Sequence, residues 1–170
     1  WRWERIISFM DPWNDPFGSG YQLTLSLMSI GRGDWFGVGL GEGLMKMGYL
    51  PDAHTDFIFS VVVEEMGLLF GICVISLLFG LSFRCFYIAR EALIKNIYFG
   101  FFASYGVAIL IGLHTFINVG VTTGLLPTKG LTLPFISYGG TNLLIMCALI
   151  GLVLRIDYET KVSMPVVHVA

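Results

Sequence analysis

Four ionisable residues lie close together where the first long apolar stretch of the chain begins. Asp56 directly precedes the apolar run that starts at Phe57, and His54 lies two residues before it. Glu64 and Glu65 follow two to three helical turns later, if the run is a helix. A carboxylate at a boundary between water and lipid is costly unless it is paired or used. Asp56 is therefore the first candidate for proton-transfer chemistry, with His54 and the two glutamates in supporting roles.

These residues also have a simpler interpretation. The helix dipole favours an aspartate in a first turn, and Thr55 or Asp52 would serve as the capping residue. A glutamate inside a span can be purely structural when it bonds the backbone of a neighbouring helix. Successive helical residues point about 100° apart. At most one of Glu64 and Glu65 can therefore face lipid cheaply, and at least one should face protein or a water-filled cavity.

A second polar group lies in and beside a stretch rich in Gly and Pro, residues 120–140. Lys129 is its only cation, a point charge suited to phosphate, although an interfacial lysine that extends toward lipid headgroups would look the same. Ser137 is a candidate substrate contact or helix cap. Asn118 and His114 are four residues apart and share a helix face, which is more typical of interhelical hydrogen bonds than of ligands.

Other apparent sites are improbable. Residues 37–43 contain four glycines but lack the following Lys-Ser/Thr and the strand-to-helix context of a phosphate loop. The three cysteines, Cys73, Cys85 and Cys147, form no CxxC pair and are interpreted as apolar groups, with no disulfide or metal site. A net charge of −2 gives no electrostatic reason to expect nucleic acid as a partner.

Composition identifies the kind of protein that must position these residues. Hydrophobic residues make up 55% of the chain and charged residues 13%, about half the share usual in soluble domains. The mean hydropathy is +0.76, which indicates an integral membrane protein. The chain opens at Trp1 without an initiator Met or a signal-peptide pattern, so we expect it to be the C-terminal part of a longer protein.

The apolar runs predict an all-α membrane protein with three transmembrane helices. The expected segments are an extracytoplasmic loop at 1–56, helices at 57–83, 97–119 and 141–155, a cytoplasmic loop at 84–96, an extracytoplasmic loop at 120–140 and a cytoplasmic tail at 156–170. Polar residues recur too often in residues 1–56 for a fourth span. Within that loop, residues 22–30 are expected to form a short interfacial helix, because a strand would need a pairing partner.

The distribution of charges predicts how the helices are oriented. Arg84, Arg90 and Lys95 lie in the first connector and Arg155 begins the tail, so the positive-inside rule places both in the cytoplasm. The segments that hold Asp56 and Lys129 would then share the outer face.

The Gly/Pro-rich stretch 120–140 should fold back into the protein. Non-helical backbone at membrane depth survives only where it is buried in protein or lines water, so we expect a re-entrant loop before the last helix. A transporter would place its polar site near the midplane. A polar cluster on one side suits an enzyme that acts at the outer surface on an amphiphile delivered from the bilayer.

Several longer motifs carry a resemblance to a known family. They are Phe9-Met10-Asp11-Pro12-Trp13, Gly20-Tyr21-Gln22, residues 36–41, residues 49–59, Glu64-Glu65-Met66-Gly67 and residues 126–140. In this order, over residues 5–155, the chain resembles the SEDS (FtsW/RodA/SpoVE) family, which polymerises the glycan strand of peptidoglycan. Residues 126–130 and the Asp11-Pro12-Trp13 step look more like the cell-division member of that family than like its elongation counterpart.

The resemblance implies a fold of about ten spans, of which this chain would hold the last three. It implies glycosyl transfer between lipid II molecules at the outer face of the bacterial cytoplasmic membrane, at the division septum. It also implies action with a class B penicillin-binding transpeptidase and other divisome proteins. The family's essential aspartate matches Asp56, and its functional lysine matches Lys129.

The resulting hypothesis is a single displacement with inversion, because lipid II carries an α-linked sugar diphosphate and the product bond is β-1,4. Asp56 is the expected general base for the acceptor hydroxyl. Lys129 would stabilise the leaving diphosphate, with Arg5 or Arg32 as candidate helpers. A divalent cation, Mg²⁺ or Mn²⁺, is a candidate bridge on the diphosphate, although no ligand cluster requires one. Two alternatives stay open, namely a lipid II flippase or carrier without bond-making chemistry and a non-catalytic scaffold of the division complex.

Overall fold

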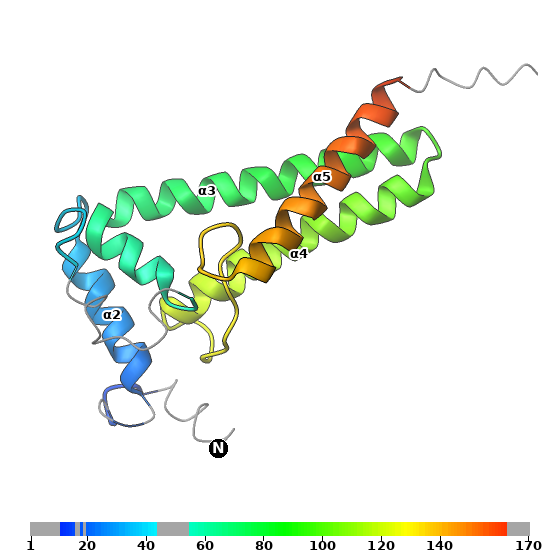
Figure 1. The fold of residues 1–170 in the computed structure, drawn as a ribbon. Coiled ribbons are helices and arrows are strands. Elements are labelled where there is room, and N and C mark those ends of the chain that lie inside the picture. The colour runs from blue at the N-terminus through cyan, green and yellow to red at the C-terminus, as the bar shows by residue number, and fades with distance from the viewer. Residues whose placement is uncertain (1–10, 16–17, 19, 44–54, 163–170) are drawn as a thin grey trace, which may run out of the picture.

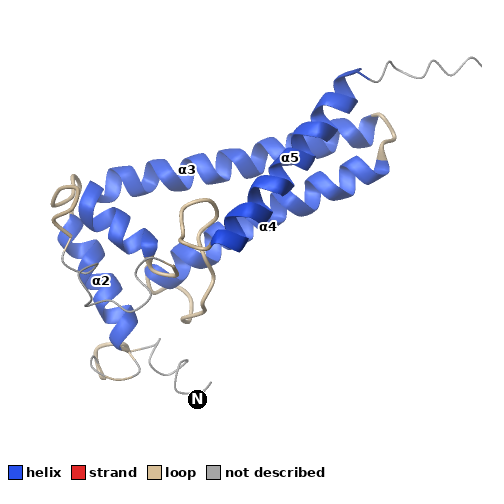
Figure 2. Cartoon of the chain, in the orientation of Figure 1, coloured by secondary structure: helices blue, strands red, loops and turns tan. Residues whose placement is uncertain are grey.

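The computed structural model describes residues 11–15, 18, 20–43 and 55–162. These residues form four helices and no strand (Figure 2). The helices are α2 (Tyr21–Gly33), α3 (Ile58–Ile94), α4 (Tyr98–Thr122) and α5 (Gly140–Val162). The last three are long and apolar enough to cross a membrane, which confirms the number of spans expected over this part of the chain.

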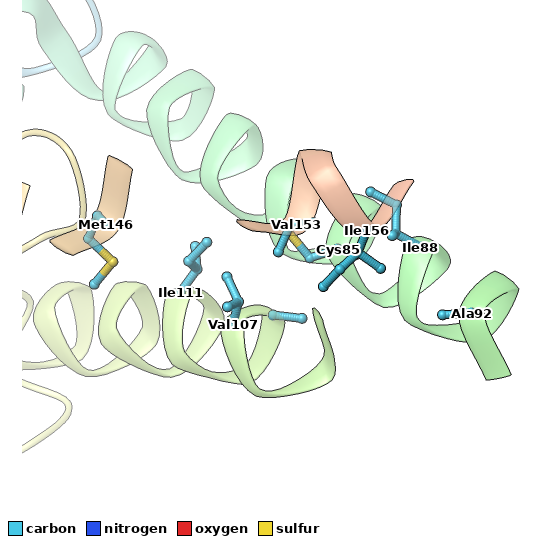
Figure 3. Packing of buried hydrophobic residues seen from close by; sticks show 9 residues of the cluster. Cys85, Ile88, Ala92, Val107, Ile111, Met146, Val153 and Ile156 are labelled. Atoms are coloured by element: carbon cyan, nitrogen blue, oxygen red, sulfur yellow. The ribbon is translucent and has the colours of Figure 1, made fainter. Parts of the chain in front are cut away.

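Helices α3 and α4 are antiparallel and joined by a short turn, and α5 lies across them (Figure 1). A cluster of buried apolar residues holds the three helices together, from Ala92 near that turn to Ile111 and Met146 further away from it (Figure 3). Its members are Cys85, Ile88, Ala92, Val107, Ala108, Ile111, Met146, Val153 and Ile156. Ala92 and Ala108 are both fully buried, and such small side chains let helix backbones approach closely. Polar contacts from Arg84 to Asp157 (3.6 Å) and from Lys95 to the carbonyl oxygen of Thr160 join α3 to α5 at the same end.

Helix boundaries differ from the sequence-based expectation. Helix α3 continues through Ile94, so the expected loop at 84–96 is mostly helical. The cations in this region indicated a connector, but no Gly or Pro interrupts residues 84–94 and Arg84 lies on an exposed face of the helix. The turn comes at Asn96, which adopts a positive φ of 59°. Helix α5 likewise continues to Val162 instead of ending at residue 155.

Helix α3 is not one straight helix, because it breaks at Gly67. That residue has a φ of 86° and a ψ of 167°, which are not helical values. Residues 58–66 therefore form a short half-helix that runs at an angle to residues 68–94 (Figure 1). The sequence predicted an uninterrupted helix over residues 57–83, and this break is a correction to it.

Helix α2 confirms the helix expected at residues 22–30 and excludes the strand. Its buried face is largely polar, with Ser26 and Ser29 both fully buried. The Ser26 hydroxyl donates to the carbonyl oxygen of Thr122 at 2.9 Å, and that of Ser29 reaches the carbonyl oxygen of Ser60 at 3.0 Å. These bonds attach α2 to the end of α4 and to the half-helix.

Residues 125–139, which form most of the connection from α4 to α5, contain no α-helix, as their Gly and Pro content predicted. Leu133 from this loop packs with Phe59 and Val63 from the half-helix and with Leu78 from the long part of α3. The loop is therefore wedged against both parts of α3, and this wedge brings distant parts of the sequence together.

Candidate functional site

Asp56 lies in the turn of residues 55–57 that precedes the half-helix. The N-cap of the helix is Phe57, and no side chain makes a capping hydrogen bond there. Thr55, one of the two capping residues considered from the sequence, is therefore not the N-cap of this helix, and the other, Asp52, lies outside the described residues. Position 56 is held instead by contacts from the loop 125–139 and from α4.

The carboxylate of Asp56 lies against Gly130. A β-carbon added at Gly130 would come within 2.9 Å of Oδ2 of Asp56. Neighbouring Cα atoms are about 3.8 Å apart, so the backbone of Lys129 lies one residue from this contact. The side chain of Lys129 is exposed. The structure thus brings the backbone that carries Lys129 to the Asp56 carboxylate, although the two residues are far apart in the sequence.

Asn118 holds the two segments together from within α4. Its Nδ2 donates to the carbonyl oxygen of Asp56 at 2.9 Å and to that of Leu131 at 2.6 Å. Only the NH2 side of the amide can serve two carbonyl acceptors, which settles its orientation. Asn118 is 1% exposed and forms hydrogen bonds within the protein, but its partners lie in the turn before α3 and in the loop, so the interhelical bond suggested by the sequence is corrected to a bond from a helix to two non-helical segments. The neighbouring His114 has a buried Nδ1 without a hydrogen-bond partner among the described residues.

Ser137 makes a second link between the loop and the Asp56 turn. Its hydroxyl donates to the carbonyl oxygen of Thr55 at 2.6 Å and accepts from the backbone N–H of Leu133 at 2.7 Å. The residue is 7% exposed. This bonding favours a positioning role for Ser137 over the substrate contact or the helix cap considered from the sequence.

Glu64 faces protein, as predicted for at least one of the two glutamates. Its side chain is fully buried, with Oε2 3.1 Å from the hydroxyl of Ser29 and Oε1 3.6 Å from the guanidinium of Arg32. Arg32 therefore meets Glu64, and its expected role as a helper of Lys129 loses support. Glu65 lies against the backbone of Gly43, where an added β-carbon would be 2.8 Å from Oε1.

Two predicted site residues, Arg5 and His54, lie outside the described residues, so their roles stay predictions. Within the described ranges, no three His, Cys, Asp or Glu side chains gather in a way that would hold a metal ion. The three cysteines are free, as expected.

An apolar cavity of about 500 Å³ opens beside the Asp56 turn. It is lined by Ile58 together with residues 135–140 and Leu143, a set that includes Ser137. Sequence reasoning did not identify this cavity, nor the role of Gly130. The only signal for Gly130 was its place after Lys129 in a loop dense in Gly and Pro, which indicates irregular backbone without saying what that backbone contacts.

Comparison with protein-family models matches residues 1–162 to the FtsW/RodA/SpoVE family of cell cycle proteins. The chain belongs to this family. A family member from Hydrogenovibrio crunogenus is 54% identical over 162 residues, and one from Aliivibrio salmonicida is 52% identical over 163 residues. Both are named probable peptidoglycan glycosyltransferase FtsW, and each alignment covers 95% of this chain.

The fold of the family is also seen in a solved structure from a peptidoglycan synthase complex, described in terms of the structural coordination of polymerization and crosslinking. That chain is 30% identical, with a TM-score of 0.69 over 94% of this chain. Family membership and three membrane-spanning helices make this a multi-pass membrane protein. The chain spans 40–41% of the length of the two curated relatives described above.

Proposed function

We propose that this chain is the C-terminal part of a peptidoglycan glycosyltransferase that polymerises lipid II during cell division. The observation that carries the proposal is the contact of the Asp56 carboxylate with Gly130, next to Lys129. Three features then lie side by side: the Asp56 carboxylate, the backbone of the residue that carries the Lys129 ammonium group, and an apolar cavity. An amphiphile with a sugar, a diphosphate and a lipid chain needs these three environments together.

In the proposed reaction Asp56 is the general base. Its carboxylate accepts the proton of the acceptor sugar hydroxyl as the hydroxyl oxygen bonds to the anomeric carbon of the donor. The bond from that carbon to the phosphate oxygen breaks, and its electron pair leaves with the lipid diphosphate. One displacement of this kind inverts the configuration at the anomeric carbon. The turn around Asp56 is held by Asn118 and Ser137, which favours a fixed position for the base.

Lys129 is proposed to meet the charge that grows on the departing diphosphate. Its exposed side chain extends from backbone adjacent to the Asp56 contact. The described residues do not fit a metal ion held by the protein, because no cluster of three ligands is present among them. We assign the stabilisation of the diphosphate in this chain to Lys129 because of its place beside the Asp56 contact, and a divalent cation that arrives with the substrate phosphates is compatible with that role.

The apolar cavity is proposed to receive the part of the isoprenoid chain nearest the diphosphate. It begins at Ile58, two residues after Asp56, and its walls are mostly apolar. Burial of apolar surface contributes roughly 25 cal/mol per Å². Such a cavity would fix the lipid end of the donor while the sugar lies at Asp56.

The setting of the reaction is also proposed. Arg84, Lys95 and Lys161 lie together at the end of α3 and α5 away from the site, and the positive-inside rule makes that end cytoplasmic. The site would then face outward, at the septum of a bacterial cytoplasmic membrane. A class B penicillin-binding transpeptidase and other divisome proteins are the proposed partners, because the solved relative comes from a synthase complex.

The decisive experiment incubates the purified full-length protein and its transpeptidase partner with lipid II in detergent, and resolves glycan chains on a gel. We expect wild type to make polymer and Asp56→Asn to lose it by about 10²–10⁴-fold, the usual contribution of a general base. Glu159→Gln is the matched control, because it removes an exposed carboxylate from the far end of α5. A flippase would make no polymer without a bilayer, and a scaffold would tolerate the Asp56 change.

A further inference from the structure

The break in α3 is filled by the backbone of a distant segment. In a continuous helix, the N–H groups of residues 68 and 69 would donate to the carbonyl oxygens of residues 64 and 65. Here Leu68 N donates to Asp34 O at 2.9 Å and Leu69 N to Trp35 O at 3.4 Å. The freed oxygens of Glu64 and Glu65 accept from Val38 N at 2.9 Å and from Gly39 N at 3.1 Å.

Segment 33–39 therefore replaces both helical bonds that the break removes. An unpaired backbone group away from water costs several kcal/mol, and a broken helix is tolerated where other groups satisfy it. The break is stable because segment 33–39 supplies two donors and two acceptors at the required places. Figure 1 shows this segment, at the end of α2, next to the bend in α3.

Two glycines make this close approach feasible. A β-carbon at Gly67 would lie 2.3 Å from the carbonyl oxygen of Trp35, and its φ of 86° is strained for any other residue. A β-carbon at Gly37 would lie 2.3 Å from the carbonyl oxygen of Glu65. Both contacts are with backbone atoms, so no side-chain rotation relieves them.

Glu64 fixes the half-helix from the side. Its buried carboxylate is anchored to α2 by Ser29 and Arg32. The same Ser29 hydroxyl lies 3.0 Å from the carbonyl oxygen of Ser60, one turn earlier in the half-helix. Helix α2 thus holds the half-helix at two levels, and a buried carboxylate without such partners would be strongly destabilising.

The angle of the half-helix decides where Asp56 lies. If α3 continued straight through Gly67, Asp56 would lie eleven residues before Gly67 on the same helix axis. Its distance from Gly67 along that axis would then be about 16 Å. In the bent arrangement the half-helix contacts Leu133 of the loop through Phe59 and Val63, and the same Leu133 packs with Leu78 beyond the break. A straight helix would separate Asp56 from Gly130 and Lys129.

We propose that segment 33–39 and Glu64 are positioning elements that keep α3 broken at Gly67 and thereby place Asp56 against the loop of Lys129. The bend of α3 at Gly67 does not depend on what reaction the protein catalyses. Its catalytic consequence rests on the proposed function. A structural test and a kinetic test therefore address it separately.

The structural test measures the bend in the full-length protein with its native cysteines replaced by alanine. Nitroxide labels at Val62→Cys and Phe83→Cys report the distance across Gly67 by pulsed electron paramagnetic resonance. A straight helix would separate these positions by about 32 Å between Cα atoms, and the broken helix by less. We expect Gly67→Ala to lengthen the distance. Gly80→Ala, on the same helix with open space around its added β-carbon, is the control and should leave the distance unchanged.

The kinetic test uses Glu64, because Gly67→Ala alone could impair folding. Glu64→Ala should lower kcat about 10- to 100-fold with little change in KM, since misplacement by about 1 Å costs on that order. Glu64→Gln keeps an oxygen for Ser29 and should recover most of the loss. A wild-type label distance in Gly67→Ala, or unchanged kcat in Glu64→Ala, would overturn the inference. Activity in Asp56→Asn would instead refute the proposed function and leave the measured bend as it is.

Discussion

Asp56 and Gly130 lie in contact, and a side chain added at position 130 would meet the Asp56 carboxylate. The carboxylate Oδ2 would be 2.9 Å from a β-carbon placed there. One of the two groups must move if any other residue replaces this glycine. A substitution at Gly130 would therefore turn the carboxylate of the proposed base away or shift the loop of the proposed cation.

Gly130→Ala is expected to lower the rate of glycan polymerisation while leaving the protein folded in the membrane. The added methyl pushes the loop or the carboxylate away by a few tenths of an ångström or more, and misplacement by about 1 Å costs roughly 10²-fold. Steady-state kinetics with lipid II measure the effect. Gly151→Ala on α5, where nothing lies within 4 Å of the added carbon, should behave as wild type. Equal rates for both variants would contradict the proposed arrangement.

Lys129→Ala is expected to reduce kcat more than KM, because the charge it stabilises grows only in the transition state. Lys129→Arg keeps the charge and should recover part of the activity, though a planar guanidinium does not reproduce a point charge. Initial rates over a range of lipid II concentrations separate kcat from KM. Equal activity of the Lys129→Ala and Lys129→Arg variants would contradict a role for Lys129 in stabilising the leaving group.

Asn118→Leu is expected to destabilise the protein by about 1–3 kcal/mol, since the carbonyl oxygens of Asp56 and Leu131 lose their buried donor. The shift of the unfolding midpoint in detergent measures this effect. Asn142→Leu removes a single, less buried bond to Thr132 and should cost less. Similar midpoints for the two variants would show that Asn118 does not hold the Asp56 turn to the loop.

Leu143→Trp is expected to narrow the apolar cavity and to impair lipid substrates according to chain length. The effect should be large for lipid II with its natural isoprenoid and small for an analogue whose chain is too short to enter the cavity, because only a chain that enters the cavity is affected when the cavity narrows. Competition between the two substrates gives the ratio of kcat/KM values. An unchanged ratio would place the lipid chain elsewhere.

The sequence-based predictions were most successful for features that depend on local composition. Long apolar runs predicted three helices in the right order, and repeated Gly and Pro predicted the irregular backbone of residues 125–139. Helix ends were predicted less well at Ile94 and Val162. Cations were taken as signs of a connector there, whereas exposed helical faces hold Arg84 and Arg155 without ending the helix.

The candidate site was only partly predictable. Asp56, Lys129 and Glu64 are charged residue types, and a charge near lipid is costly in any fold. Their types alone therefore indicated either a catalytic or binding role or pairing inside the protein. Ser137 is bonded within the protein at both Thr55 and Leu133, so its side chain is a link between segments. Nothing in the local pattern around Ser137 distinguishes such a link from a substrate contact.

The amino-acid sequence by itself determined that this chain crosses a membrane three times and carries an acid and a lysine beside apolar runs, since hydration costs follow from residue type. Tertiary structure decided that α3 breaks at Gly67 and that Asp56 meets Gly130. A glycine in an apolar run is compatible with a straight helix, and at this break the backbone of residues 34–39 supplies the hydrogen bonds that the helix loses. Those hydrogen-bond partners come from a distant part of the chain. The sequence around Gly67 does not show that they will lie beside it in the folded protein.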